Sequence, residues 1–341
     1  GGNPFHHHQD LNRLVKAWQR PNTIIVNEIW WNAQARHADI IFPANTALER
    51  NDLMLNPRDP TIVANKKSID SFSNSKSDYE IFSGLANRLG FESTFTDNKN
   101  AMEWIEFLWE ESKKIAKDFK ITLPDFKKFW ANGFYEVPCP DKKKIMFENF
   151  RNDPENFPLK TPSGKIEISS NTIESFQLKD CLSHPSWFEP YEWLGKINKY
   201  TLHLISNQPT HRLHGQLDNA SDSRKSKIKD REPVLINSLD ANKRSIKDDD
   251  IVMLYNDRGK VLAGAILSKD VMPGVVVLST GAWFDPNYTL NTEVHGNPNV
   301  LTNDVGTSSL GQGPTSHTTL IGSVAKGIPG SDILNSDSVS N

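Results

Sequence analysis

The spacing of apolar residues differs between the first and the last third of the chain. Near the N-terminus four apolar residues recur at the i, i+3, i+4 and i+7 positions of an amphipathic helix: Leu11, Leu14, Val15 and Trp18. Beyond them, residues 23–28 and 39–44 are short apolar runs typical of buried strands, and residues 32–38 between them favour a short helix. A strand–helix–strand order predicts a parallel sheet with helices on its faces.

Further helices are expected before residue 135. Ser77 and Glu80 have the spacing of a capping box and predict a helix that ends at Gly90. A longer helix is expected at about 100–118 and a short one within 124–133. We therefore interpret residues 1–135 as one α/β domain.

The remainder of the chain has a different pattern. Residues 136–197 are rich in proline, asparagine and aromatic residues, and we interpret them as a connection with one strand at 165–170. From residue 198 short β-rich runs alternate with turn signals, at 200–206, 233–238, 250–256, 260–268 and 274–280. Many short strands between turns predict a closed barrel or a sandwich over 198–322. The polar, Gly- and Ser-rich residues 323–341 are expected to be a disordered tail.

Composition excludes several classes of protein. The length of 341 residues allows two domains, and the net charge of −3 gives no general attraction for nucleic acid or anionic membranes. Two cysteines cannot form a disulfide framework, and no apolar run approaches the roughly 20 residues that span a bilayer. The chain lacks an initiator methionine and starts within a turn-like stretch, so we expect it to be part of a longer protein, without its targeting segment.

The run His6-His7-His8 follows a turn-like Gly1–Pro4 stretch. Adjacent side chains point in different directions on a helix or a strand, so three consecutive histidines do not converge on one metal ion. Polar residues before a helix suit capping or an anion such as a phosphate, because free backbone N–H groups point there. Both alternatives stay open from the residues alone, with a metal site and a tag scar less favoured.

Polar residues also follow the predicted strands of the first domain. Asn27 and Glu28 end the strand at 23–28, where a carboxylate is well placed to accept hydrogen bonds from a ribose. Arg50 follows the second strand, and Asp78 lies at a predicted helix start, where an ordinary N-cap is the alternative.

The β-rich half has three further polar loops. Their residues are neutral hydrogen-bonding groups, which suit a polar, anionic ligand. The loops contain Ser206, Asn207, Gln208 and His214; Asn297 and Asn299; and Gln312, Gly313 and Pro314. We find no catalytic triad, phosphate-binding glycine loop or paired catalytic acids, so no catalytic residue and no metal ligand is predicted in this chain.

Five stretches, in order, resemble one known family. They are GGNPFHHHQD, ARHADIIFPANTALERND, ISNQPTHRLHGQLD, DIVMLYNDRGKVLAGAILSKDVMPGVV and HGNPNVLTNDVGTSSLGQGP. Together they resemble the molybdopterin oxidoreductases of the dimethyl sulfoxide reductase family, in the branch of the trimethylamine N-oxide, dimethyl sulfoxide and biotin or methionine sulfoxide reductases. One departure is SIKDDDIV, where relatives often have a Gly-x-x-Gly-Asp pattern, which predicts a looser turn.

The resemblance implies a bis(molybdopterin guanine dinucleotide) cofactor with molybdenum, an α/β domain that holds one dinucleotide, and a double-psi β-barrel over both pterins. It implies contacts with the pyrophosphate or pterin for Asn3 and His7, with ribose and guanine for Asn27 and Glu28, with a phosphate for Arg50, and with the guanine edge for Asp78. The barrel-side contacts implied are Ser206, Asn207, Gln208, His214, Asn297, Asn299 and Gln312–Pro314.

The resemblance further implies a reaction: oxygen-atom transfer from an S-oxide or N-oxide. The molybdenum ligand would then lie in an N-terminal half of the same polypeptide, outside this chain, and the electron donor would be a c-type cytochrome or a thioredoxin-like reductant. A periplasmic location is favoured over a cytoplasmic one. The alternatives are a relative with another reaction, such as formate oxidation or nitrate reduction, and a non-redox binding module.

Overall fold

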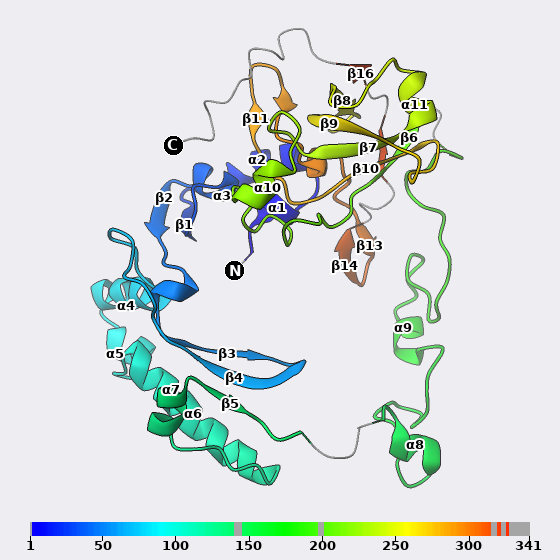
Figure 1. The fold of residues 1–341 in the computed structure, drawn as a ribbon. Helices are drawn as coiled ribbons and strands as arrows, with labels where there is room; N and C mark the ends of the chain where they lie inside the picture. Colours follow the sequence, from blue (N-terminus) through cyan, green and yellow to red (C-terminus); the bar gives the residue numbers. More distant parts are fainter. Residues whose placement is uncertain (1, 140–144, 197–200, 315–318, 322–324, 327–341) are drawn as a thin grey trace. The chain divides into compact units, whose positions relative to one another are not determined.

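The structure is a computed structural model that describes residues 2–139, 145–196, 201–314, 319–321 and 325–326. The chain divides into two compact units (Figure 1). Unit 1 comprises Gly1–Asn22, Asn32–His37 and Ile166–Asn341, and unit 2 comprises Thr23–Trp31 and Ala38–Lys165. The opening residues thus pack with the C-terminal part of the chain, whereas the sequence grouped them with residues up to 135.

Unit 2 contains the predicted parallel strand pair. Strand β1 (Ile25–Glu28) pairs in parallel with β2 (Ile40–Pro43), with Ile25 opposite Ile40. A further parallel bridge joins Ala44 to Lys76, just before helix α4 (Asp78–Leu89). The carboxyl ends of these segments therefore lie at one edge.

The rest of unit 2 is an antiparallel sheet with helices. Strands β3 (Asp52–Asn56), β4 (Asp59–Asn65) and β5 (Phe134–Glu136) pair in that order. The sequence analysis did not predict this sheet. Leu53, Met54 and Leu55 are consecutive apolar residues, and Met54 and Leu55 are exposed, so the alternation that identifies a half-buried strand is lacking.

The predicted helices of unit 2 are confirmed. They are α4, α6 (Ala101–Asp118) and α7 (Phe126–Asn132), with two short additions, α5 (Glu92–Thr96) and α8 (Glu148–Asn152), and the 3₁₀ turn η1 (Ala47–Glu49). Ser77 and Glu80 form the expected capping box, and Gly90 ends α4 with φ +82°. Trp109 of α6 stacks on Phe129 of α7 at a ring separation of 3.7 Å, in a core shared with Ala64 of β4.

The histidine run does not open the first long helix. It lies in and just after a separate short helix, α1 (Pro4–His7), while α2 (Leu11–Trp18) begins after Asp10, whose carboxylate accepts a hydrogen bond from the Arg13 N–H. Phe5 and Leu11 are fully buried with Phe284 and Val300, which come from the other end of the chain. This apolar cluster holds the opening residues in unit 1.

The predicted strand at 165–170 is wrong. The structure has no strand there, and a short helix, α9 (Asn171–Ser175), follows it. Ile166 and Ile168 alternate with polar residues, but 66% and 78% of their surface is exposed. Without a neighbouring strand or a core, the alternation alone does not form a strand.

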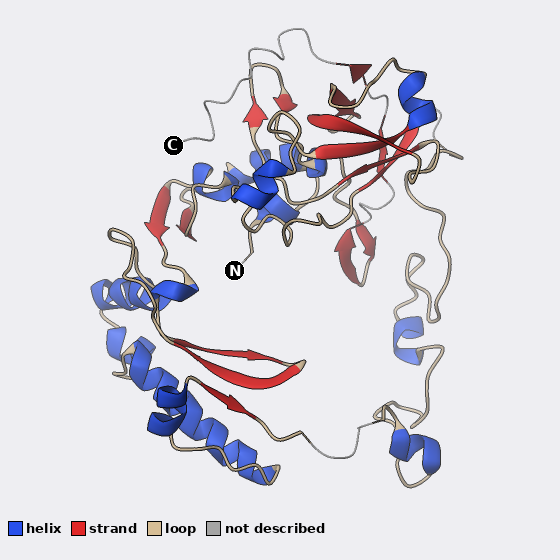
Figure 2. Cartoon of the chain, viewed as in Figure 1, coloured by secondary structure: helices blue, strands red, loops and turns tan. Residues whose placement is uncertain are grey.

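A mixed sheet forms the centre of unit 1, and its strands are red in Figure 2. The predicted strands are confirmed as β6 (Leu202–Ile205), β7 (Pro233–Asn237), β8 (Ile251–Tyr255), β9 (Lys260–Ser268) and β10 (Val275–Leu278). β10 runs parallel to β6 and antiparallel to β7, and β7 runs parallel to β9. Fully buried aliphatic residues, among them Leu204, Ile236 and Leu254, fill the core.

Short elements complete unit 1. They are α3 (Ala33–Arg36), α10 (Ser221–Lys225), α11 (Ser238–Asn242), η2 (Pro298–Val300), β11 (Pro286–Asn287), β12 (Thr292–Glu293), β13 (Gly306–Ser308), β14 (Gly311–Pro314), β15 (Thr319–Ile321) and β16 (Ala325–Lys326). Apart from β16, the predicted tail at 323–341 lies outside the described residues. In the described part of the chain, no helix has the length and apolar character that crossing a membrane requires.

The turn expected to be loose is held by hydrogen bonds. Ser245 and Asp249 adopt φ values of +56° and +62°, the left-handed region that favours glycine. The Asp250 carboxylate accepts from the Lys247 N–H at 2.8 Å, and the Asp248 carboxylate accepts from the Leu267 N–H at 2.7 Å. These two aspartates tie the turn to itself and to β9.

Candidate functional site

The carboxyl edge of the parallel segments in unit 2 gathers three of the predicted site residues. Asn27 and Glu28 end β1, and Asp78 follows Lys76, whose backbone N–H donates to the Pro43 carbonyl of β2 at 3.1 Å. The Asn27 amide donates to the Asp78 carboxylate, with 3.0 Å between Nδ2 and Oδ1. The structure thus joins two residues that are 51 positions apart in sequence.

Asp78 is not the cap of its helix. Ser77 is the N-cap of α4, and its hydroxyl accepts the hydrogen bond of the Glu80 N–H at 3.2 Å. Asp78 is exposed to solvent. Since capping does not engage it, its oxygens remain available to a ligand apart from the one hydrogen bond from Asn27.

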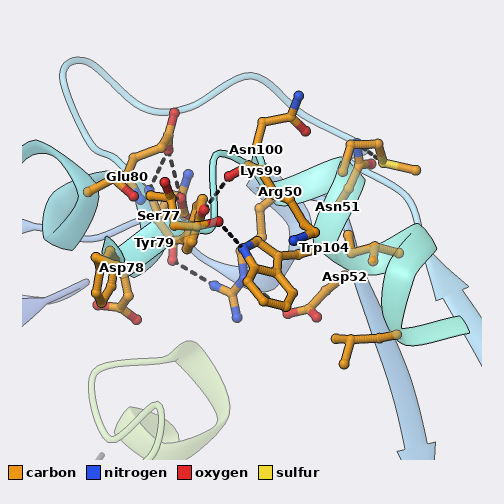
Figure 3. A pocket seen from close by; sticks show the side chains of 18 of the residues that line it. Arg50, Asn51, Asp52, Ser77, Asp78, Tyr79, Glu80, Lys99, Asn100 and Trp104 are labelled. Carbon is orange, nitrogen blue, oxygen red and sulfur yellow. Dashed lines mark hydrogen bonds and ion pairs between the residues drawn. The ribbon is translucent and has the colours of Figure 1, made fainter. Parts of the chain in front are cut away.

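Asp78 and Arg50 line one large groove in unit 2, of about 1190 Å³ (Figure 3). Arg50 lies at 3.3 Å from the Asp52 carboxylate and donates to the Asn45 carbonyl at 3.3 Å. Glu28 does not line the groove, and its carboxylate accepts from its own neighbour, the Ile29 N–H, at 2.9 Å. The groove carries both signs of charge, which suits a polar heterocycle with a phosphate better than a plain anion.

Asn45 is a further groove residue, which the sequence analysis missed. It is only 5% exposed, and among the described residues its Oδ1 has no hydrogen-bond partner. A buried amide oxygen without a partner costs free energy, so such a group indicates an unfilled polar site. Its position directly after the strand at 39–44 is the signal that had already singled out Asn27.

In unit 1 the loop after β6 meets the histidine run. The rings of His7 and His214 lie edge to face at 5.1 Å, and Gln208 is hydrogen-bonded to the His214 ring, with 3.0 Å between Nε2 and Nδ1. Partial burial, and secondly His214, lower the pKa of His7 below its ordinary value, so His7 is neutral at pH 7.

The first two residues of that loop differ from each other in their contacts. Ser206 follows β6 directly and is half-buried, while Asn207 is exposed and accepts a hydrogen bond from the Ser279 hydroxyl at 2.8 Å. Gln312, Gly313 and Pro314 belong to β14, which pairs with β13. The hairpin thus contains the third predicted loop.

Asn297 and Asn299 are buried, and their side chains form hydrogen bonds with other residues of the chain. The Asn297 amide donates to the Ala282 and Phe5 carbonyls at 2.7 and 3.3 Å, and its oxygen accepts from the Asn299 N–H at 3.0 Å. The Asn299 oxygen accepts from the Thr302 hydroxyl at 3.0 Å. In this structure the two side chains hold the opening loop, residues 3–8, which includes the short helix α1 with His6 and His7. They have little capacity left for a direct ligand contact.

Two residues of the opening loop have buried polar atoms without partners. Among the described residues neither side-chain atom of Asn3 has a hydrogen-bond partner, and neither does Nε2 of His6. Burial, and then His7, lower the pKa of His6 to about 4, so its ring is neutral. A set of neutral donors and acceptors without partners fits a hydrogen-bonding heterocycle or an ester-linked phosphate.

The described residues include no cluster of three or more histidine, cysteine, aspartate or glutamate side chains that could hold a metal ion. The sequence matches the family "Molybdopterin oxidoreductase" over residues 1–88 and the family "Molydopterin dinucleotide binding domain" over residues 202–320. The chain belongs to the molybdopterin oxidoreductase family. The cofactor that these families name is a molybdopterin dinucleotide, and the resemblance predicted from five sequence stretches is confirmed.

Curated relatives in this family are reductases of S-oxides and N-oxides. The chain is 46% identical to the biotin sulfoxide reductase of Cereibacter sphaeroides and 43% identical to the trimethylamine-N-oxide reductase of Haemophilus influenzae, each over 94% of this chain. It spans 43% and 40% of the length of these two molybdopterin oxidoreductases.

A solved structure shares the fold. Acetylene hydratase from Pelobacter acetylenicus superimposes with a TM-score of 0.71 over 94% of this chain and 42% of that one, at 15% sequence identity. The mixed sheet of unit 1 is consistent with the molybdopterin oxidoreductase fold.

Proposed function

We propose that this chain holds the dinucleotide cofactor of a molybdenum oxidoreductase that reduces S-oxides or N-oxides. The overall reaction converts the oxide to a sulfide or an amine with two electrons and two protons, and the oxygen atom leaves as water. The molybdenum cofactor supplies the redox chemistry, and the residues of this chain bind and orient it. In this proposal no catalytic residue lies in the chain.

The guanosine end of one dinucleotide lies in the groove of unit 2. The observation that carries this proposal is the Asp78 carboxylate, which is exposed beside the groove, is released from capping by Ser77, and is bonded to Asn27. A carboxylate can accept the ring N–H and the exocyclic amine of guanine together, and no other common base offers that pair. Asn45 and Arg50 supply further polar contacts, with Arg50 toward a phosphate.

The pterin and pyrophosphate side belongs to the loops of unit 1. Asn3, His7, His214 and Gln208 supply hydrogen-bonding groups there, and Ser206, Asn207 and the residues Gln312–Pro314 extend the set. Asn297 and Asn299 act by holding the opening loop. We propose that the mixed sheet is the double-psi β-barrel of the family, with two guanine dinucleotides bound to the whole protein.

The partners follow from the reaction. The chain functions together with the remainder of a longer polypeptide that supplies the molybdenum ligand. Electrons come from a c-type cytochrome or a thioredoxin-like reductant, and the periplasm is the favoured compartment.

The identity of the nucleotide tests this proposal. The protein that contains this chain is denatured, the released cofactor is cleaved at its pyrophosphate, and the nucleotides are separated by chromatography. We expect GMP together with molybdenum in the sample. CMP, or no nucleotide, would contradict the proposal.

A further inference from the structure

His214 adopts a backbone conformation that is unfavourable for its residue type. Its φ is +50°, in the left-handed region, and it lies in the segment between β6 and α10 whose Gln208 contacts its ring. A non-glycine residue at positive φ persists only where its surroundings hold it. The turn at His214 therefore needs a structural cause.

Two glycines allow close packing against this turn, but they do not fix its backbone conformation. A side chain at Gly281 would put its first carbon 2.1 Å from the His214 carbonyl oxygen, and one at Gly215 would lie 2.5 Å from the His6 ring. The backbone of the turn is thus packed closely between the 281–283 segment and His6. Close packing excludes larger side chains, but a hydrogen bond is needed to fix the direction of the carbonyl.

Arg212 supplies that hydrogen bond. Its Nε donates to the His214 carbonyl at 3.0 Å, and its two terminal nitrogens donate to the Thr280 carbonyl at 3.1 Å and the Ser223 hydroxyl at 3.3 Å. Only 2% of its side chain is exposed. The planar guanidinium therefore ties the turn at once to the segment before Gly281 and to α10.

The charge of Arg212 is balanced within the same cluster. Asp218 and Glu232 lie at 3.3 and 3.1 Å from its nitrogens, and Lys227 reaches the same two carboxylates at 2.8 and 2.7 Å. Burial by itself would raise the pKa of Asp218. The hydrogen bond from His295 and the charges of Lys227 and Arg212 outweigh it and hold that pKa well below the ordinary value. Since Lys227 also neutralises both carboxylates, the distinctive contribution of Arg212 is its fork of N–H donors.

We propose that Arg212 is a positioning residue that fixes the left-handed turn at His214 and so holds the His214 imidazole between Gln208 and His7. The inference rests on the proposed function only for the identity of the ligand that His214 faces. The turn itself can be measured without any ligand.

The test uses the whole chain and begins with three substitutions. Arg212→Lys keeps a positive charge beside Asp218 and Glu232 but cannot donate to three acceptors in one plane. His214→Gly tolerates positive φ without strain, and its spectrum identifies the ring signals of His214 by their loss. Arg244→Lys is the matched control, because Arg244 is a partly buried arginine of unit 1 that donates to the Asp240 carbonyl at 3.0 Å.

Two measurements report the turn directly. Hydrogen exchange with mass spectrometry follows the amides of residues 207–218, and the ¹⁵N shifts of the His214 ring follow its hydrogen bond with Gln208. In Arg212→Lys we expect about tenfold faster exchange, confined to that segment, and ring shifts of a free imidazole. In the double variant with His214→Gly we expect at least half of the lost protection to return, because glycine adopts the turn unaided.

Several results would overturn the inference. The inference is overturned if the exchange rates and ring shifts of Arg212→Lys match those of Arg244→Lys. It is also overturned if the exchange effects of the Arg212 and His214 substitutions are additive in the double variant. If Arg212→Lys raises exchange throughout β7 and β9, Ser223→Ala decides instead. It removes one acceptor of the guanidinium, together with the Ser223 hydrogen bond to Asp218 at 3.1 Å, and leaves the charges. We expect a smaller increase limited to 207–218, and no local increase would contradict the proposal. Failure of the nucleotide test above leaves these results unaffected.

Discussion

The candidate residues of unit 1 and those of unit 2 differ in how much of their bonding capacity the protein already uses. The side chain of Asn297 is fully buried and makes three hydrogen bonds, with the Phe5 carbonyl, the Ala282 carbonyl and the Asn299 N–H. Asp78 in unit 2 is exposed, and the structure gives its carboxylate one hydrogen bond, from Asn27.

This difference indicates two ways of building a binding site. In unit 1 the backbone of the opening loop is held before any ligand arrives, so the energy of positioning is part of the folding energy. In unit 2, under the proposed function, the ligand would supply the missing hydrogen bonds, so we expect little stability to depend on the groove. Substitutions in unit 1 should therefore lower stability first, whereas substitutions in the groove should lower ligand content first.

Asn297→Ala should have the largest effect on stability. The change leaves the Phe5 and Ala282 carbonyls and the Asn299 N–H without partners in a buried place, which costs about 3 kcal/mol of unfolding free energy in unit 1. Denaturant unfolding measures it, with the exposed Asn22→Ala in the same unit as control. A loss of unfolding free energy no larger than that of the control would contradict the view that the unit 1 candidates are part of the folded framework.

The pH dependence of the unfolding free energy of unit 1 should reveal that His6 is neutral in the folded state. Burial lowers its pKa from 6.5 to about 4, so between these values the unfolded chain takes up a proton that the folded chain does not. The free energy of unfolding therefore falls as the pH drops from 7, and at pH 5 His6 accounts for a loss of about 2 kcal/mol. His6→Gln should remove this part of the pH profile in denaturant unfolding. Identical pH profiles for the two proteins would show that the ring is not buried in its neutral form.

Ser77→Ala separates capping from ligand binding in unit 2. Loss of the N-cap of α4 should cost about 1 kcal/mol of unfolding free energy. Since Asp78 is the proposed guanine contact, the nucleotide content of the protein should stay near that of the wild type. Thermal melting and nucleotide analysis of the same sample check both expectations, and an unchanged melt would mean that Ser77 does not cap the helix.

The sequence predicted those elements well whose formation depends on neighbouring residues in the chain. The capping box at Ser77 and Glu80, the left-handed Gly90 and the alternating strands of the unit 1 core depend on local chemistry, and they appear as expected. The hairpin at 52–65 was missed because its exposed Met54 and Leu55 break the alternation. The false strand at 165–170 had the alternation but no partner.

The candidate sites were only partly visible in the sequence. A strand end drew attention to Asn27 and a helix start to Asp78, but their mutual hydrogen bond depends on the bridge between Ala44 and Lys76, which no local pattern reports. The bonding of Asn297 to Phe5, 292 positions away, likewise depends on the tertiary fold. The sequence analysis singled out the loop around Arg212 for its neutral polar residues and did not predict the buried charges there.

The most direct test of the account is the guanine nucleotide content of Asp78→Asn in the protein that contains this chain. An asparagine amide opposes a guanine donor, and one mismatched hydrogen bond lowers affinity about tenfold. The matched control is Asp70→Asn, an aspartate of the same unit whose side chain is fully exposed and paired with Lys67. We predict that GMP and molybdenum per protein fall in Asp78→Asn and not in the control, while the melting temperature before cofactor loading changes little in both. Full GMP and molybdenum content in Asp78→Asn would contradict the assignment of the groove to the guanosine end of the cofactor.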